Sequence, residues 1–452
     1  GSIEQQIKRN QLQEAAHQLN LLAKTALHDP RIFLLGSRLA EAASNPDGML
    51  QAARKAYQLA PQWPVAAIHL ASVLASRGEA EEAMASAALA IQQATTSGSL
   101  GSQLLNKAAG VAHTLGRYQQ ALGWLRQSEE LDPRDTSTRY KIGLTLLSSR
   151  AFSGAVDIFT ALLVQRPGNP SILSARLQAF LGEKNLELAI QDGEALLVQD
   201  PTNAEYQFYL AIARGETPRT QPASIVLGLF NSGADRFDRH LVVQLRYKLP
   251  RDVAQMIKAW HPDGKGDVLD LGCGTGLLGA CLGPIEGVLV GVDLSEQMIA
   301  QAAHHNVYDS FHRVNVLDAL QATPGDVYHV ITALDVLIYV GSLEDVIPNA
   351  HRILLPGGRF VFSCETGVDG AADYALQSTY RYTHQRGYVQ RQLDAAGFKD
   401  IEMEDRVLRH EAGQPVQGFL VIARKEAQAT LKAVTRKRTT KKVPVWPPKS
   451  PT

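Results

Sequence analysis

The stretch Val268-Leu-Asp-Leu-Gly-Cys-Gly-Thr-Gly-Leu-Leu-Gly279 decides the fold of the second half of the chain. Its apolar run ends around Asp270, and a loop with glycines at positions 272, 274 and 276 follows. Such a run is typical of a buried parallel strand, and the glycines let the backbone turn tightly beside a ligand. The next apolar run, residues 287–293, ends in Asp293, about 20 residues after the first glycine, where a carboxylate is placed to bind ribose hydroxyls.

Two kinds of cofactor fit a glycine-rich loop followed by an acid. Residues 274–279 satisfy the G-x-G-x-x-G pattern of nicotinamide dinucleotide sites, which is weak evidence alone. Asp270, just before the first glycine, would repel a pyrophosphate but suits an ammonium and a sulfonium. The Asp-x-Gly-x-Gly-x-Gly run resembles the first motif of the class I S-adenosylmethionine (SAM)-dependent methyltransferases. The resemblance implies SAM as the cofactor, and an NAD site or a structural Rossmann-like domain is the alternative.

Length and composition set the broad class. A chain of 452 residues is long enough for two or three domains, and its 45 basic and 45 acidic residues indicate no partner by bulk charge. The three cysteines lie far apart without a CxxC pair, so we expect no metal site or disulfide framework, and a cytoplasmic location. No apolar run approaches ~18 residues, so no membrane span is expected. Gly1-Ser2 looks like a tag remnant, which leaves a removed signal peptide open.

Residues 3–214 are rich in Ala, Leu, Gln and Glu with helical periodicity. Asp132-Pro133, Arg166-Pro167 and Asp200-Pro201 recur at intervals of 34, as do Ala121, Ala155 and Ala189; looser copies precede them. A period of 34 with small residues at helix contacts resembles the tetratricopeptide repeat (TPR), in which stacked helix pairs bury a shared core. The resemblance implies a groove for a protein or peptide. The alternative is an array that only spaces the catalytic domain or joins subunits of a homo-oligomer.

Residues 215–266 form a bridge. Two prolines in residues 215–222 end the helical pattern. The following segment resembles the one that precedes the first motif in many small-molecule and TPR-linked methyltransferases, where it covers the SAM pocket. Phe230, Phe237, His240 and Tyr247 are therefore candidate lid residues, although ordinary core packing is an equal alternative for each.

Residues 267–425 alternate between strand and helix patterns, as a doubly wound parallel sheet requires. We expect a Rossmann-like seven-stranded domain whose last two strands, near residues 398–405 and 419–423, form a hairpin. That hairpin separates a methyltransferase sheet from a nicotinamide-binding one. The whole chain is thus predicted to be multidomain, with an all-α TPR-like solenoid followed by a class I methyltransferase domain.

Ligands of such sheets bind at the carboxyl ends of the parallel strands. Asp270 is expected near the SAM amine, Asp293 at the ribose, and the residues after the third strand at the adenine. Relatives often carry Asp at the position of Asn315, so Asn315 and Asp318 both stay open, and helix capping is the alternative for Asp318. The expected cofactor-binding residues are Asp270, Gly272, Cys273, Gly274, Gly276, Asp293, Leu294, Met298, Asn315, Val316, Asp318 and Leu334.

Methyl transfer needs a general base only where the acceptor is protonated. The candidates are His384, Asp335 and Tyr339. His384 comes first because its free pKa lies near neutrality, although a lone loop histidine is more often structural. Helix capping is the alternative for Asp335. The Asn/Asp-Pro-Pro-Tyr/Phe motif of adenine-methylating enzymes is absent after the fourth strand, where Ala333-Leu-Asp-Val336 stands.

Residues 426–452 form a Pro-rich tail that has no acid after Glu426. Disorder is the expected state, and an anionic partner or docking in a groove is the alternative. Three functions remain: methylation of a protein or peptide side chain presented by the solenoid, methylation of a small or carrier-bound metabolite, or a non-catalytic scaffold. Intact Asp270 and Asp293 count against the scaffold.

Overall fold

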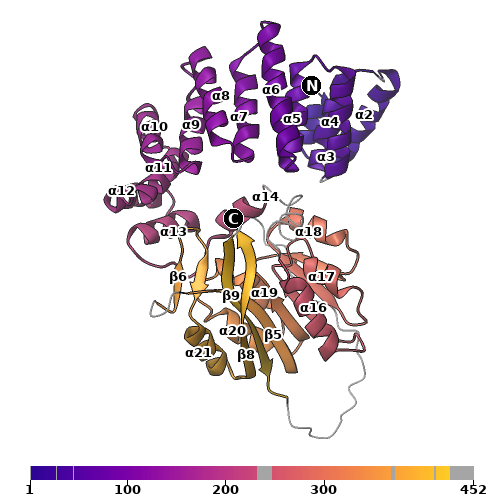
Figure 1. Ribbon diagram of the computed structural model, residues 1–452, viewed down its shortest axis with the longest axis vertical. Coiled ribbons are helices and arrows are strands. Elements are labelled where there is room, and N and C mark those ends of the chain that lie inside the picture. Colours follow the sequence, from indigo (N-terminus) through magenta and orange to yellow (C-terminus); the bar gives the residue numbers. More distant parts are fainter. Residues whose placement is uncertain are drawn as a thin grey trace. The chain divides into compact units, whose positions relative to one another are not determined.

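The computed structural model describes residues 2–26, 28–43, 45–231, 247–367, 372–411 and 414–427. The chain divides into two compact units, Gly1–Glu216 and Thr217–Thr452. The division falls two residues after the predicted end of the repeat array. Each unit is described by itself, and Figure 1 shows the helices of the first and the mixed sheet of the second.

The first unit is helical throughout its described residues. Consecutive helices pack against each other as neighbours. Their bounds are α1 Ser2–Lys8, α2 Leu12–Thr25, α3 Pro30–Ala42, α4 Pro46–Leu59, α5 Pro64–Ser76, α6 Ala80–Thr96, α7 Ser102–Thr114, α8 Tyr118–Leu131, α9 Thr136–Ser148, α10 Phe152–Gln165, α11 Pro170–Glu183, α12 Leu186–Gln199 and α13 Ala204–Ala213.

The helix starts repeat with the period predicted from the sequence. Helices α7, α9, α11 and α13 begin 34 residues apart, and so do α8, α10 and α12. The same spacing separates α3 from α5 and α4 from α6, so the early copies also keep the period. The register breaks at α6, which has 17 residues where α4 and α8 have 14. That break explains why the first part of the array reads as irregular from sequence.

Small residues let these helices approach closely. Ala121, Ala155 and Ala189, the recurring alanines of the second helix in each pair, are all completely buried. Gly143 in α9 faces the buried ring of Phe159 in α10, and a Cβ at position 143 would lie 2.5 Å from a ring carbon. The array is therefore packed through positions that tolerate no larger side chain.

The second unit is built on one mixed sheet. Its strands are β1 Val268–Leu271, β2 Leu289–Asp293, β3 Ser310–Arg313, β4 Tyr328–Ala333, β5 Leu354–Thr366, β6 Tyr374–Leu376, β7 Tyr382–His384, β8 Phe398–Glu411 and β9 Gln414–Lys425. The parallel order is β3-β2-β1-β4-β5. Strand β9 then pairs antiparallel with β5, and β8 pairs antiparallel with β9. The predicted reversed hairpin at the end of the domain is thus present.

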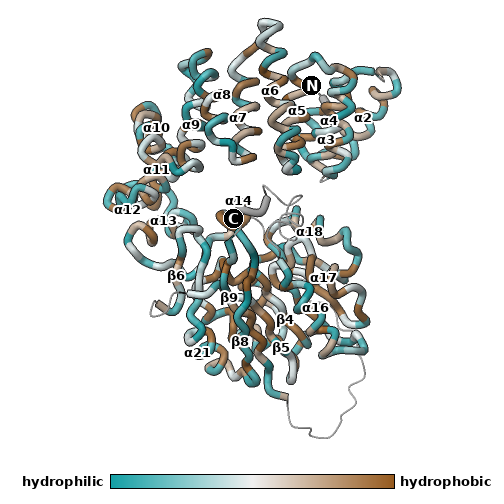
Figure 2. The backbone as a smooth tube through the Cα atoms, viewed as in Figure 1, coloured by the Kyte–Doolittle hydropathy of each residue, from teal (hydrophilic) through white to brown (hydrophobic). Residues whose placement is uncertain are grey.

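Helices cover both faces of this sheet. On one face, α16 (Leu249–Trp260) and α17 (Leu277–Leu282) pack over residues of β1, β2 and β9. On the other face, α19 (Val316–Ala322), α20 (Val346–Ile353) and α21 (Arg386–Ala396) pack over β4, β5 and β9. Figure 2 shows hydrophobic residues along the central strands between these layers.

The structure adds a short hairpin that the sequence interpretation did not contain. Strand β7 pairs parallel with the end of β5, and β6 pairs antiparallel with β7. His384 is expected in a loop, but residues 382–384 form a buried strand. In the described ranges, no helix is long and apolar enough to cross a membrane, and no cluster of ligating side chains suited to a metal ion is found.

We predict that overpacking a repeat alanine destabilises the array. Ala189→Leu places three extra carbons in a fully buried position of α12, and the free energy of unfolding should fall by about 1–3 kcal/mol. Ala195→Leu, on the exposed side of the same helix, is the matched control and should leave it unchanged. Urea unfolding of the full chain, followed by circular dichroism, measures both. Equal effects of the two substitutions would contradict the packing described above.

Candidate active site

A cavity of about 320 Å³ lies at the carboxyl ends of β1, β2 and β4. The glycine loop forms its floor, and the start of α18 (Glu296–Ala303) and the segment after β4 form its sides. Part of the lining precedes β1 in the chain, namely Thr220, Gln221 and Tyr247. Another part follows β5, namely Arg381, Arg409 and Glu411. The site is therefore assembled from residues almost 200 positions apart in the chain.

Asp293, the last residue of β2, anchors the glycine loop. Its Oδ2 accepts a hydrogen bond from the Gly274 N–H at 2.9 Å, and its Oδ1 accepts one from the Ser295 N–H at 2.8 Å. Burial raises the pKa of this carboxyl, and the backbone donors oppose that shift. Each oxygen keeps a lone pair for a further donor. The carboxylate can thus hold the loop and still accept two hydroxyl groups from a ligand.

Asp270 lies inside β1 and is only 3% exposed. Its Oδ2 accepts from the Tyr308 hydroxyl at 2.7 Å, and its Oδ1 accepts from the Thr332 hydroxyl at 2.7 Å. Burial raises the pKa of Asp270 to about 6, while the two hydroxyl donors lower it. This carboxyl is therefore ionised at neutral pH although it lies in the interior, and it borders the cavity.

Gly272 explains why the loop requires glycine. Its φ is +63°, a left-handed conformation that a side chain disfavours, and a Cβ there would lie 2.3 Å from Val336 Cγ2. The loop thereby brings bare backbone to the cavity floor. Cys273 also lines the cavity, but burial raises the pKa of its thiol, so it is no thiolate nucleophile.

Asp335, two residues after β4, has an unusual conformation. Its φ is +56°, rare for a residue with a side chain, and its N–H donates to Ser363 Oγ at 2.8 Å. Its Oδ2 accepts from Arg409 at 3.0 Å, while its buried Oδ1 has no hydrogen-bond partner among the described residues. Burial raises the pKa of this carboxyl, and Arg409 opposes the shift. An unusual backbone conformation and an oxygen without a described partner thus coincide at a residue that lines the cavity.

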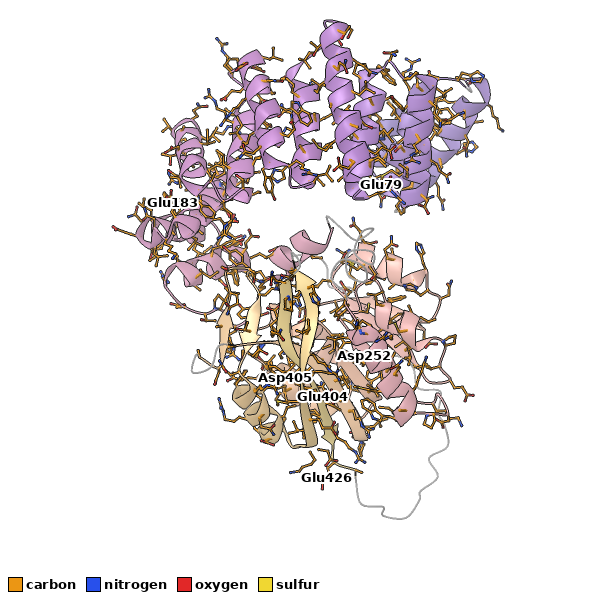
Figure 3. The ribbon with its side chains drawn as sticks, in the orientation of Figure 1. Glu79, Glu183, Asp252, Glu404, Asp405 and Glu426 are labelled. Carbon is orange, nitrogen blue, oxygen red and sulfur yellow. The ribbon has the colours of Figure 1, made fainter. Side chains whose placement is uncertain are left out.

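Arg409 organises a charged cluster that sequence reasoning missed. The guanidinium is 4% exposed and donates to Asp335, Glu365 and Glu411. Arg381 also pairs with Glu365 and Glu411. Figure 3 labels Glu404 and Asp405 earlier on β8, which belong to exposed ion pairs, whereas Arg409 on the same strand is buried. Glu365 lies in a buried run of β5, whereas Arg409 lies in β8, most of which is partly or fully exposed, so no local sequence pattern marks the pair.

Comparison with known proteins fits this geometry. Residues 269–360 match the family described as "Methyltransferase domain". A ubiquinone biosynthesis O-methyltransferase of Thiobacillus denitrificans is 29% identical over 186 residues, covering 35% of this chain and 78% of the relative. The Pseudomonas entomophila enzyme of the same name is 30% identical over 127 residues, covering 26% of this chain and 55% of the relative.

Two solved structures are similar to parts of this chain. A magnesium protoporphyrin IX methyltransferase from Synechocystis with bound SAH covers 45% of this chain and 99% of its own, with 20% identity and a TM-score of 0.35. The protein YrrB, described as a TPR protein with an unusual peptide-binding site, covers 42% of this chain and 95% of its own, with 18% identity and a TM-score of 0.34. The second unit carries a SAM-dependent methyltransferase domain.

The residues of the cavity fit SAM. Asp270 offers a buried negative charge for the cationic end of the cofactor, and both oxygens of Asp293 keep acceptor capacity for a ribose. The apolar side chains of Leu294 and Met298 line the cavity beside Asp293, where a flat base can pack. The remaining expected cofactor residues that line the cavity are Gly272, Cys273, Gly274, Asn315, Val316 and Leu334.

The structure separates the two candidates near the adenine end. Asn315 lines the cavity and also caps α19, since its side chain accepts from the Leu317 N–H at 2.8 Å. Asp318 lies in the first turn of α19, is exposed, and does not line the cavity. Gly276 is the residue before α17, with φ +81°, and it shapes the loop without lining the cavity.

Tyr339 and His384 lie in different surroundings. Tyr339 lines the cavity, and burial raises its pKa to about 12, so it stays protonated at neutral pH. His384 is fully buried in β7, outside the cavity lining. Its Nε2 donates to the backbone oxygens of Val340 and Gly341, and burial lowers its pKa to about 4. The histidine therefore holds the segment after β4 in place and has no recorded contact with the cavity.

Of the expected lid residues, Tyr247 lines the cavity, and burial together with the charges of Asp335 and Asp270 raises its pKa well above the usual range. Phe237 and His240 lie outside the described residues, as does the side chain of Phe230. Residues 219–221 also form part of the rim of the cavity. There the Gln221 N–H donates to the backbone carbonyl oxygen of Tyr339 at 3.0 Å.

We predict that Asp293→Ala weakens SAM binding at least roughly tenfold, because ligand hydrogen bonds and the anchor of the glycine loop are lost together. Asp318→Ala, an exposed neighbour outside the cavity, is the control and should bind normally. Isothermal titration calorimetry measures both affinities, and thermal unfolding checks that each variant is folded. Wild-type affinity in Asp293→Ala, or a loss in Asp318→Ala, would show that the ribose end of the site is misassigned.

Proposed function

We propose that this methyltransferase acts on an oxygen of a small molecule and that Asp335 is its general base. The observation that carries the proposal is that Asp335 lines the cavity while its Oδ1 has no hydrogen-bond partner in the described part of the chain. A hydroxyl group on an acceptor supplies the donor that this oxygen lacks. The names of the curated relatives, ubiquinone biosynthesis O-methyltransferases, support an oxygen acceptor on a small molecule.

SAM supplies an activated methyl group on a sulfonium, so the protein has to position the acceptor and take its proton. Burial raises the pKa of Asp335, which makes it a stronger base than an exposed carboxylate. Arg409 holds the other oxygen, so that Oδ1 keeps a fixed direction. Tyr339 remains protonated and can donate to a second oxygen of the acceptor. Orientation of this kind can contribute up to about 7–11 kcal/mol to lowering the barrier.

The same cavity has to hold both SAM and the acceptor, which favours a small acceptor. Its volume of about 320 Å³ is at the lower end of the range for small-molecule sites, roughly 300–1,000 Å³. A protein substrate would have to insert a single side chain. That second candidate, a protein or peptide presented by the first unit, is favoured by the helical array itself. A non-catalytic scaffold would not require Asp270 and Asp293 to remain buried and ionisable.

We further propose that the array is a TPR-type solenoid that binds a protein or peptide, either a carrier of the metabolite or the substrate itself. The recurrence of helix starts at intervals of 34 residues and the buried alanines support this assignment. A cytoplasmic location, a homo-oligomer and an anionic partner for the basic tail, residues 426–452, remain secondary proposals.

Labelled lysate tests the substrate class. The full chain is incubated with lysate and SAM carrying a labelled methyl group, and macromolecules are then separated from solvent-extractable small molecules. We expect the label in the small-molecule fraction, as a base-stable methyl ether. Label confined to protein would replace the first proposal with the second, and no transfer under any condition would leave the scaffold.

Paired substitutions test the base. Asp335→Asn keeps the size and the contact to Arg409 but removes the proton acceptor, so turnover should fall by about 10²–10⁴-fold. SAM affinity should change little. His384→Gln should lower the melting temperature while retaining turnover, because the histidine contacts backbone oxygens outside the cavity. Full turnover in Asp335→Asn, or an inactive but folded His384→Gln, would reverse the two assignments.

A further inference from the structure

Tyr308 joins two parts of the cofactor site through one hydroxyl group. It lies between α18 and β3, and its hydroxyl donates to Asp270 Oδ2 at 2.7 Å. The same oxygen accepts from the Gly279 N–H at 3.2 Å. The hydroxyl therefore connects the carboxylate of β1 with the helix that follows the glycine loop. Tyr308 was not among the residues expected from sequence.

Gly279 provides the space for this contact. A Cβ at that position would lie 2.3 Å from Tyr308 Cε2 and 2.7 Å from Cζ, so any side chain would displace the ring. Gly279 is the third glycine of the G-x-G-x-x-G pattern, which in dinucleotide sites allows close packing of helix and strand. In this chain the same glycine admits a tyrosine ring, which accounts for the formal match to that pattern.

The surroundings of Asp270 make the tyrosine hydrogen bond important. The carboxylate is nine-tenths buried or more, and among the described residues the groups around it are the hydroxyls of Tyr308 and Thr332, the Cys273 thiol, the Tyr247 phenol and the Asp293 carboxylate. None of these carries a positive charge. Burial and the Asp293 charge favour the protonated form of Asp270, and only the hydroxyl donors oppose them.

We propose that Tyr308 is a positioning residue of the cofactor site: it directs the Asp270 carboxylate and stabilises its negative charge for the cationic end of SAM. The inference rests on the proposed function, since it assigns Asp270 to the ammonium of the cofactor. Gly279 is part of the same arrangement, because its lack of a side chain leaves space for the Tyr308 ring. Tyr308 itself does not line the cavity, so it acts through Asp270.

Titration of SAM into Tyr308→Phe between about pH 5 and 7.5 tests the proposal. In the wild type, affinity should fall below a midpoint near pH 6, where Asp270 takes up its proton. Loss of the hydroxyl should move that midpoint upward by about one unit, and weaken binding about threefold at pH 6.5. Gly279→Ala should shift the midpoint in the same direction. Tyr328→Phe is the matched control, because Tyr328 begins β4, at the end of the strand away from Thr332 and Asp270. This substitution should not shift the midpoint. An equal loss of affinity at every pH, without a shift of the midpoint, would mean that Tyr308 contributes packing alone.

A second readout needs no cofactor. The folded-state pKa of Asp270 lies above its unfolded value, so its ionisation lowers stability as pH rises through the interval between the two values, and the penalty persists above pH 6. Tyr308→Phe raises the folded pKa further, so its destabilisation should be larger at pH 8 than at pH 5. In an Asp270→Asn background this pH dependence should vanish. If the wild type binds no SAM, the proposed function fails, while this measurement still decides whether Tyr308 controls Asp270. Equal destabilisation at both pH values would overturn the inference.

Discussion

The burial of two carboxylates at the ends of neighbouring parallel strands constrains the whole catalytic unit. A carboxylate taken out of water costs several kcal/mol unless donors surround it. Asp293 obtains its donors from backbone N–H groups at positions 274 and 295, which fixes the glycine loop and the start of α18. Asp270 obtains hydroxyl donors from Tyr308 and Thr332. The hydrogen bonds that satisfy these carboxylates also fix their positions at the cavity, so Asp270 stays ionised beside the proposed cofactor site although its buried charge lowers stability.

The same rule explains the opposite end of the cavity. Burial raises the pKa of Asp335, and Arg409 on β8 opposes that shift with its positive charge. Arg409 in turn needs several acceptors, which Glu365 and Glu411 provide. This arrangement depends on the reversed strand β9, because β9 pairs with β5 on one side and with β8 on the other. The β8–β9 hairpin distinguishes this sheet from a nicotinamide-binding one. It therefore also places Arg409 where its guanidinium can bind Asp335, the proposed base.

Features formed by residues close together in the sequence could be predicted, whereas features that depend on contacts between distant residues could not. Asp270 and Asp293 were identified because strand, loop and acid are consecutive, and the parallel order then brings their ends together. Arg409 could not be identified, because its contact with Asp335 spans 74 positions and depends on strand register. His384 was interpreted as a loop residue since its polar neighbours hide a two-residue pairing with β5. The 34-residue period was visible wherever its register was unbroken, and the longer α6 concealed it in the first copies.

The cavity also requires residues that precede the sheet. Thr220 pairs with Val340 in an isolated antiparallel bridge, and the Gln221 N–H donates to the backbone carbonyl oxygen of Tyr339. Arg219 adds contacts to Ser342 from the same short segment. The segment before the domain was interpreted as linker and lid, yet these residues behave as an edge strand bonded to the segment that carries Tyr339. Arg409 and Glu411 also line the cavity, and they lie outside residues 269–360, the part that matches the methyltransferase family model. The proposed acceptor end of the cavity therefore depends partly on residues beyond the segment that matches this family.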